Sequence, residues 1–407
     1  MTLSPFEYRQ PVRLVYGENS IERLGDLVRE HGGTKVLLVT DKGIVQAGHA
    51  ERAAQSISKA GLSVATFDGV DENPTTRHVS ACVEFAKKHD VTFIVGLGGG
   101  SSMDTAKGAN FVLSNGGKMA DYWGTNRAAK PMLPFIAVPT TAGTGSECQS
   151  YALISDEDTH RKMACGDDKA YARVALLDPV LTVSQPLAVT ANTGIDTITH
   201  ALEAHVTTAR TPVSQIFSRE SWRLAEAHLE TVLHEPKNIA ARGAMQLASA
   251  YGGMAIAQSM LGAAHSAANP LTAVYNVVHG QAVGIMLPHV VRFNAQDTEA
   301  ALGYADLACA VKIARGADDP RQAVDSLLER LFKLLAAAHI PESLEQCGAA
   351  RSRVPELAED AARQWTARFN PRKIGMDDFR ALYESAFHPR PMAGADFAQF
   401  RQRREDR

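Results

Sequence analysis

The segment NTGIDTITHALEAHV, residues 192–206, places a carboxylate and an imidazole one helical turn apart. Asp196 and His200 stand at positions i and i+4, so on a helix their side chains share one face, with Cβ atoms about 5–6 Å apart. His205 follows five residues later and points elsewhere, which favours a structural role. Taken alone, Asp196 and His200 are better explained as a surface ion pair than as a metal site.

Two later histidines favour the metal interpretation. His265 and His279 lie in GAAHSAANPLTAVYNVVHGQAVG, a segment of low polarity in which an unpaired imidazole would be costly. One carboxylate and three imidazoles suit a divalent iron or zinc ion with an open position for substrate. We therefore expect Asp196, His200, His265 and His279 to act in catalysis through a metal. The remaining histidines are expected at helix ends or on the polar surface: His31, His49, His78, His89, His160, His228, His234, His289, His339 and His388.

A glycine-rich loop in FIVGLGGGSSMDTAKGANFVL, residues 93–113, joins an apolar strand to a helix. Glycines let the backbone turn sharply and approach a ligand closely. The helix that follows would offer unpaired N–H groups and the positive end of its dipole to a pyrophosphate. Four glycines in five residues exceed what a plain tight turn needs, although Ser101 stands where the common dinucleotide fingerprint has its third glycine. The residues concerned are Gly96, Gly98, Gly99, Gly100, Ser101 and Ser102.

Two further features point to a dinucleotide. Asp41 ends the apolar run KVLLVT and could accept a hydrogen bond from an adenosine ribose while repelling a 2′-phosphate, which favours NAD over NADP. It could equally cap the next turn. The loop VPTTAGTGSE, residues 138–147, also follows a strand and offers the hydroxyls of Thr140, Thr141 and Thr144. Two such loops on one sheet suit an extended dinucleotide.

The elements that must position these residues change in character near residue 182. Residues 1–182 alternate apolar runs with helical patterns, which predicts a parallel sheet covered on both faces, in a Rossmann-like dinucleotide-binding α/β domain. Residues 183–407 predict an all-helical domain, shown by the leucine stripe of residues 324–335. We expect the site in a cleft between the domains. The expected strands are 12–17, 35–40, 63–67, 92–98 and 134–140, and two of the helices between them are 21–32 and 78–90.

Composition excludes several classes of function. A net charge of −3, from 42 basic and 45 acidic residues, gives no electrostatic surface for nucleic acid or an anionic membrane. No apolar stretch approaches the roughly 20 residues of a membrane helix, and no secretory signal is visible. Five scattered cysteines form neither a disulfide framework nor a zinc knuckle, so a cytoplasmic protein is expected.

The chain resembles the iron-containing (group III) alcohol dehydrogenases. The resemblance rests on GLGGGSSMDTAKG, PTTAGTGSE, GIDTITHALEA, HSAANPLTAVYNVVHG and FNPRK, which occur in the family's order from about residue 10 to 390. It implies the dehydroquinate synthase-like architecture, a homodimer, and a metal held by Asp196, His200, His265 and His279. It also implies NAD(H) at Asp41, Asn73, Gly98, Gly99, Gly100, Ser101, Ser102, Asp104, Thr140, Thr141, Thr144 and Lys162, with Asp104 near the nicotinamide.

One position departs from the family pattern. Many members have another histidine four residues after the third metal ligand, whereas this chain has Asn269. Asparagine hydrogen-bonds but does not relay a proton at neutral pH, so both the proton route and the substrate pocket are expected to differ.

We therefore expect an NAD-dependent metal alcohol dehydrogenase or aldehyde reductase for small primary alcohols, diols or their aldehydes. The ligand types accept both Fe2+ and Zn2+, and the family resemblance favours Fe2+. The alternatives are a zinc enzyme like glycerol dehydrogenase, and a non-redox lyase like dehydroquinate synthase. The lyase needs a basic pocket for a phosphorylated substrate, but Lys and Arg are not clustered around the metal ligands. A metal-stabilised binding protein would require a closed ligand set.

Overall fold

The computed structural model describes residues 5–159, 161–316 and 319–390, which form two compact units. The α/β unit comprises Arg9–Pro186 and Lys237–Gly253. The helical unit comprises Leu187–Pro236 and the described residues from Met254 onward, together with residues 5–8. The division falls inside helix α8 (Ile239–Ser259), which the sequence pattern did not indicate. In the first part of this helix, Gln246 Nε2 donates a hydrogen bond to Pro139 O, and Ser249 Oγ accepts one from Gly145 N. This part of α8 therefore belongs with the sheet.

A six-stranded parallel sheet forms the centre of the α/β unit, in the order β1-β9-β6-β4-β2-β3. Its four inner strands are almost wholly buried, as the sequence predicts for a parallel sheet, whereas the edge strands β1 and β3 are partly exposed. A smaller sheet, β5-β8-β7, was not predicted. The strands are β1 (Arg13–Tyr16), β2 (Lys35–Val39), β3 (Ser63–Phe67), β4 (Phe93–Gly98), β5 (Gly124–Thr125), β6 (Phe135–Pro139), β7 (Tyr151–Ser155), β8 (Lys162–Gly166) and β9 (Val174–Leu177).

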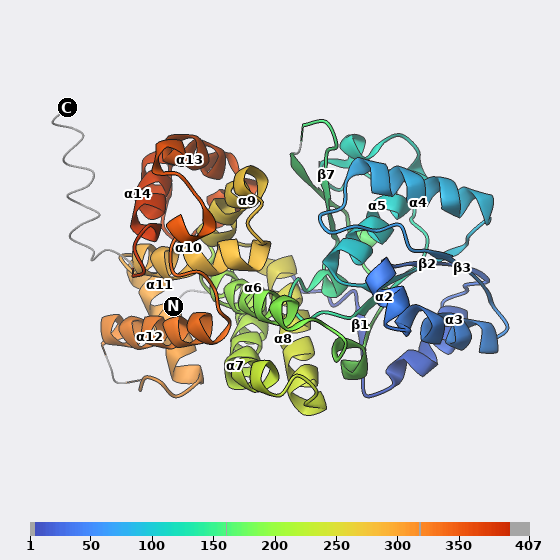
Figure 1. Ribbon diagram of the computed structural model, residues 1–407, viewed down its shortest axis with the longest axis horizontal. Coiled ribbons are helices and arrows are strands. Elements are labelled where there is room, and N and C mark those ends of the chain that lie inside the picture. Colours follow the sequence, from blue (N-terminus) through green and yellow to red (C-terminus); the bar gives the residue numbers. More distant parts are fainter. Residues whose placement is uncertain (1–4, 160, 317–318, 391–407) are drawn as a thin grey trace. The chain divides into compact units, whose positions relative to one another are not determined.

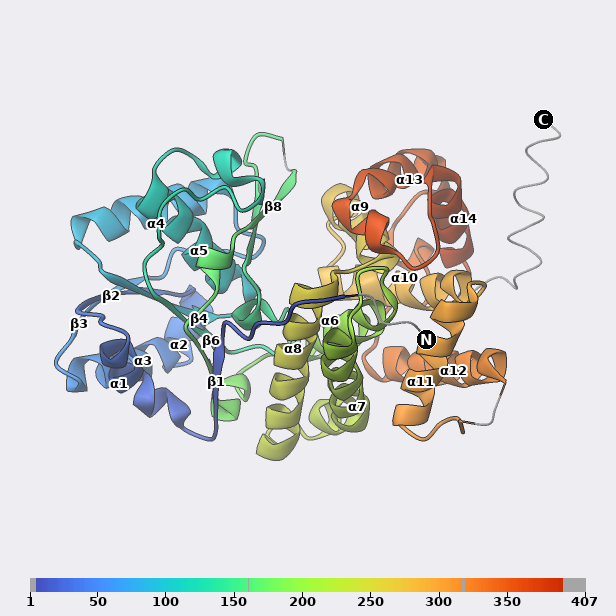
Figure 2. The ribbon, with the colours of Figure 1, turned by 180° about the vertical axis from the view of Figure 1, so that it is seen from behind.

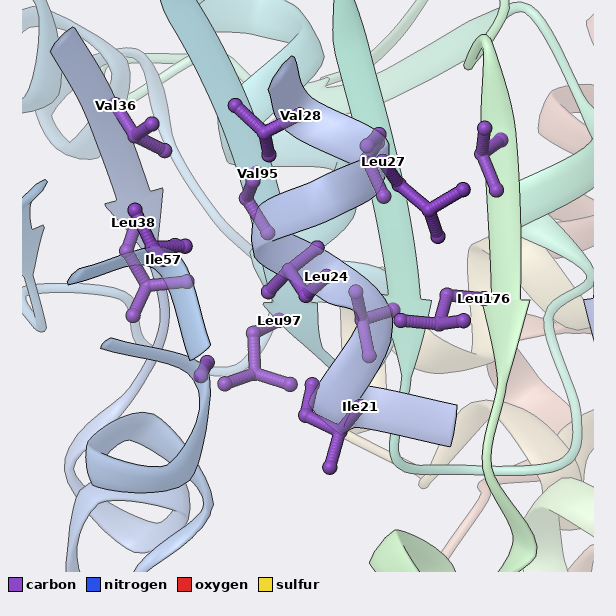
Figure 3. Close-up of a cluster of buried hydrophobic side chains, with 14 of the residues drawn as sticks. Ile21, Leu24, Leu27, Val28, Val36, Leu38, Ile57, Val95, Leu97 and Leu176 are labelled. Carbon is purple, nitrogen blue, oxygen red and sulfur yellow. The ribbon is translucent and has the colours of Figure 1, made fainter. Parts of the chain in front are cut away.

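Helices cover both faces of the larger sheet, with α1 and α3 on one side and α4 and α5 on the other (Figures 1 and 2). Figure 3 shows how α1 and its preceding turn place Ile21, Leu24 and Val28 over strand residues such as Leu38 and Val95. Removal of this apolar surface from water stabilises the packing of α1 on the sheet. The packing also holds in place the strands whose ends carry Asp41, the glycine loop and the threonine loop. These helices are α1 (Leu24–Glu30), α2 (Lys42–Gln46), α3 (His49–Lys59), α4 (Thr76–Lys88) and α5 (Gly100–Asn115).

Every regular element described after Leu187 is helical, as predicted. The leucine stripe lies on α12, where Leu327, Leu331 and Leu334 are buried. None of the described helices combines the length and apolar character needed to span a bilayer. The helices are α6 (Leu187–Val206), α7 (Pro212–His234), α9 (Ala263–Tyr275), α10 (His279–Asn294), α11 (Thr298–Ala310), α12 (Pro320–Ala337), α13 (Val354–Arg363) and α14 (Met376–Ala386).

Candidate metal and dinucleotide sites

Three helices of the helical unit bring the predicted metal ligands together. Asp196 lies on α6, His265 in the first turn of α9, and His279 is the first residue of α10. Asp196 Oδ1 is 3.4 Å from His265 Nε2 and 3.8 Å from His279 Nε2. One ligand atom from each of these residues lies within 4.8 Å of the other two, so a single ion could contact all three.

His200 lies beside this group but is not part of the mutual 4.8 Å set. Its Nε2 is 3.4 Å from Asp196 Oδ1, which agrees with the i, i+4 spacing on α6. Its ring stacks on that of His265, with centroids 4.9 Å apart and planes inclined by 13°. The structure therefore places all four predicted side chains close together around Asp196, and His279 is the most exposed of them.

The polar atoms at this centre fit a cation. Asp196 Oδ1 and His265 Nε2 are buried, and neither makes a hydrogen bond of acceptable geometry with any described residue. Buried polar atoms without partners are costly, so they indicate a group that completes their bonding. A set of one carboxylate and three imidazoles suits Fe2+ or Zn2+.

Electrostatics at the centre also favour positive charge. Burial alone would lower the pKa of His265, but the nearby carboxylates of Asp196 and Glu203 raise it to about 9. Burial alone would raise the pKa of Asp196, but the neighbouring imidazoles, led by His200, hold it well below its usual range. The centre therefore stabilises a positive charge, either as a proton or as a bound cation.

Glu203, which the sequence analysis did not identify, orients His265. Its Oε2 lies 2.6 Å from His265 Nδ1, and its Oε1 accepts a 2.6 Å hydrogen bond from Ala264 N. The carboxylate keeps the proton on Nδ1, which leaves the Nε2 lone pair available for a metal. Glu203 lies at i+7 from Asp196, on the same face of α6. This spacing could have revealed it in the sequence.

Glu203→Gln is expected to weaken metal binding by about 10–100-fold, because the amide cannot match the charge that supports His265. Competition with a chelator of known affinity measures the effect. Glu342→Gln, at an exposed position of the same unit, serves as the control. Equal metal affinity in Glu203→Gln and the control would show that Glu203 only fills space.

The FNPRK motif connects the helices that carry His265 and His279. Asn370 Oδ1 accepts from Ala263 N, at the start of α9, at 3.2 Å. The Asn370 side chain also exchanges two hydrogen bonds, of 3.1 and 2.7 Å, with Asn294 at the end of α10. This pairing explains how a motif more than 90 residues from His265 supports the candidate metal centre.

The dinucleotide loops lie where the strand order of the larger sheet changes direction. The chain passes from β2 outward to β3 and then returns to β4 on the other side of β2. Open α/β sheets bind ligands at such a switch point, beyond the carboxyl ends of the strands. Asp41 follows β2, the glycine loop follows β4 and the threonine loop follows β6, so the three predicted features end adjacent strands.

The backbone of the glycine loop leaves no room for side chains. Gly98 has φ +149°, and a Cβ there would lie 2.4 Å from Ser102 Oγ. A Cβ on Gly100 would lie 2.7 Å from the Thr144 side chain, so the two loops are in contact. Helix α5 begins at Gly100, and its first N–H groups, from Gly100 to Ser102, are those that could bind a phosphate.

The two interpretations of Asp41 are compatible in the structure. Its Oδ1 accepts from Ile44 N at 3.0 Å and thereby caps α2, as a strand-end aspartate often does. Its Oδ2 lies 3.4 Å from Ser102 Oγ, beside the glycine loop. Asn73 is exposed, with a left-handed φ of 54°, in the loop after β3.

Asp104 is a buried residue of α5, the helix that follows the glycine loop, and its carboxylate accepts hydrogen bonds from other residues of the α/β unit. Ser146 Oγ donates to one carboxylate oxygen at 2.7 Å, and Leu153 N donates to the other at 3.2 Å. Burial raises the pKa of Asp104, while the charges of Lys107 and Lys162 act in the opposite direction. Lys162 is the first residue of β8 and is exposed.

Lys107 is a buried residue that the sequence analysis missed. Its Nζ donates to Ser146 O and Ser146 Oγ, at 2.6 and 2.8 Å, and to Tyr151 O at 3.0 Å. Burial lowers the pKa of Lys107 to about 8, against the opposing charges of Asp104 and Glu147. Lys107 and Asp104 together tie α5 to the end of the threonine loop. The signal was present, because Asp104 and Lys107 are one turn apart on α5.

The expected surface position of His289 is wrong. It lies inside α10, where Nδ1 is 2.8 Å from Ser385 Oγ and burial lowers its pKa to about 3. His49 and His78 stand at helix starts, as expected, but are also buried. His205 Nδ1 lies 2.9 Å from Ser218 Oγ, and its Nε2 lies 3.3 Å from Asp306, contacts that fit a structural role. His160 lies outside the described residues.

Comparisons with known proteins identify the family of this chain. The family description "Iron-containing alcohol dehydrogenase" matches residues 11–179, and "Fe-containing alcohol dehydrogenase family, C-terminal" matches residues 190–387. The NAD-dependent methanol dehydrogenase of Bacillus methanolicus is 33% identical over 377 residues, covering 92% of this chain and 98% of that protein.

Two solved structures have a similar fold. A 1,3-propanediol oxidoreductase superimposes with a TM-score of 0.91 at 31% identity, covering 94% of this chain and all of that one. The sulfoacetaldehyde reductase of Bifidobacterium kashiwanohense, in complex with NAD+, has a TM-score of 0.84 at 28% identity. It covers 94% of this chain and 99% of that one.

Proposed function

This chain belongs to the iron-containing alcohol dehydrogenase family, and we propose which of its residues bind the metal and the NAD(H) that this oxidoreductase family implies. Asp196, His200, His265 and His279 hold one divalent ion, with Fe2+ preferred. The glycine and threonine loops hold NAD(H). The substrate is a small primary alcohol or diol, or the corresponding aldehyde. The observation that carries this proposal is the close approach of Asp196, His265 and His279, in which Asp196 Oδ1 and His265 Nε2 are buried and make no hydrogen bond with any described residue.

When bound, the divalent ion supplies Lewis acidity and NAD accepts the hydride. The protein positions these groups. Glu203 keeps a proton on His265 Nδ1, and Asn370 and Asn294 hold the two helices that carry His265 and His279. The first N–H groups of α5 orient the pyrophosphate. Asn269 stands where many relatives have a histidine, so no proton relay is assigned to that position.

Turnover of alcohols by the iron-loaded protein tests the function. Protein purified and loaded anaerobically is given NAD and a panel of C2–C4 alcohols and diols, and NADH absorbance is followed. Parallel assays supply NADH and the aldehydes. We expect turnover with primary alcohols, and more activity with Fe2+ than with Zn2+. No turnover in either direction, with either metal, would refute the dehydrogenase proposal.

Removing the charge of Asp41 is expected to relax discrimination against NADP. Asp41→Asn keeps an oxygen that can cap α2 but loses the charge that would repel a 2′-phosphate. The ratio of kcat/KM for NADP to that for NAD should rise about tenfold, or ~1.4 kcal/mol. Asp41→Gly should show the same rise and also lose roughly a few tenths of a kcal/mol of stability, because glycine is itself tolerated at a helix N-cap. An unchanged ratio in both variants would mean that Asp41 acts only as a cap.

We also propose that the protein is a cytoplasmic homodimer. All five cysteines are free thiols, which supports a reducing compartment. The dimer follows from the family resemblance, and light scattering on the eluted protein tests it.

A further inference from the structure

Asn269 lies one turn beyond His265 on α9, the helix that carries this candidate ligand. With about 100° of rotation per residue, Asn269 stands roughly 40° around the helix from His265, and Thr272 roughly 20° on the other side. The two polar residues therefore share the side of α9 that bears His265. Their neighbours, Ala267, Ala268, Pro270 and Leu271, are apolar.

A chain of hydrogen bonds fixes the orientation of the Asn269 amide. Asn269 Nδ2 donates to Gln364 Oε1 at 3.1 Å, and Gln364 Nε2 donates to Asp360 Oδ1 at 3.2 Å. An ionised carboxylate only accepts hydrogen bonds, so Asp360 sets the direction of the chain. Gln364 must turn its amide nitrogen toward Asp360 and its oxygen toward Asn269. The Asn269 nitrogen is thereby directed to Gln364, which leaves its Oδ1 as an acceptor on the other edge.

Thr272 provides an independent sign of a missing polar partner. Its Oγ1 is buried and makes no hydrogen bond with any described residue. A threonine in a helix commonly bonds the carbonyl four residues earlier, but Thr272 does not do so here. A buried hydroxyl without a partner, on the His265 side of an otherwise apolar stretch, favours a hydroxyl-bearing ligand at this place.

We propose that Asn269, oriented by Gln364 and Asp360, is a specificity-determining residue that selects small diols and hydroxyaldehydes over simple alcohols. This inference rests on the proposed function. The reacting oxygen of the substrate is placed at the metal, and its second hydroxyl donates to Asn269 Oδ1, one helical turn away. A site built to bond a hydroxyl rejects substrates that lack it, because its own polar groups would then be left unpaired.

The test compares 1,3-propanediol with 1-propanol, which have the same carbon chain. Wild type should have the higher kcat/KM for the diol. In Asn269→Leu, which keeps the approximate volume without the amide, the diol-to-propanol ratio should fall about tenfold or more, while 1-propanol changes little. Gln364→Leu should lower the ratio in the same direction by less. Ala273→Leu, which adds a leucine at an exposed position of α9, should leave the ratio unchanged.

Binding without turnover provides a second measurement. Calorimetry of 1,3-propanediol on the metal-loaded protein with NADH, which cannot react with an alcohol, should show a weaker Kd in Asn269→Leu at unchanged metal content. An equal loss for both alcohols, or an unchanged ratio and an unchanged diol Kd, would overturn the inference. Absence of any turnover by wild type would instead refute the proposed function, and the Kd comparison would still decide the role of Asn269.

Discussion

His265→Ala is expected to lose the bound metal and to lower kcat/KM by about 10³-fold or more. The substitution removes the imidazole whose Nε2 lies 3.4 Å from Asp196 Oδ1, and it also leaves Glu203 as a buried carboxylate without its partner. Loss of one preorganised electrostatic contact costs about 10²–10³ in rate, and loss of the metal itself should cost more. Metal content by mass spectrometry and turnover on the same preparation measure the two effects together.

The matched control for this substitution is His234→Ala, at the exposed end of α7 in the same unit. It should keep both metal and activity. Circular dichroism should show that His265→Ala is still folded, so that metal loss reflects the missing ligand. A folded His265→Ala protein that remains active without metal would contradict the assignment of His265 as a ligand.

Gly280→Ala is expected to displace the metal centre although the residue binds nothing. A Cβ at position 280 would lie 2.1 Å from Asn192 O and 2.6 Å from the carbonyl carbon of Asn192. Both atoms belong to the backbone of α6, so α6 and α10 must move apart. Asp196 lies one turn after Asn192, and His279 precedes Gly280. The same shift therefore separates two candidate ligands.

We expect Gly280→Ala to cost about 1–3 kcal/mol in the free energy of unfolding, the usual range for overpacking, and to weaken metal binding. Urea unfolding of the metal-free protein and chelator competition measure the two effects. Gly375→Ala is the control, because a Cβ there meets nothing within 4 Å. If Gly280→Ala matches this control in both measurements, the close packing of α6 on α10 does not determine the site.

Much of the fold could be predicted because its signals are local. Each of the five expected strands lies in the six-stranded sheet, since a parallel sheet needs continuous apolar runs. The sixth strand of this sheet, β9, was not predicted, and neither was the small sheet, whose strands β7 and β8 mix polar with apolar residues. The grouping of Lys237–Gly253 with the α/β unit depends on hydrogen bonds to residues about 100 positions away, which no periodicity reveals.

The candidate site was predictable only in part, because some of its residues are brought together by contacts between helices that are distant in the sequence. Four ligand types at characteristic spacings, and loops at strand ends, can be read from the sequence. The roles of Asn370 and Gly280 could not, because each depends on how α6, α9 and α10 pack. The spacing of Glu203 from Asp196 is visible in the sequence, but its contact with His265 depends on the same packing. His289 was placed wrongly because a histidine buried against Ser385 has no local signature.

Anomalous diffraction at the iron absorption edge, from crystals of the anaerobically iron-loaded protein, tests the central claim most directly. The account predicts a single strong peak within ligand distance, about 2.0–2.3 Å, of Asp196, His200, His265 and His279. A fully loaded, active protein whose iron peak lies away from these four side chains would contradict it.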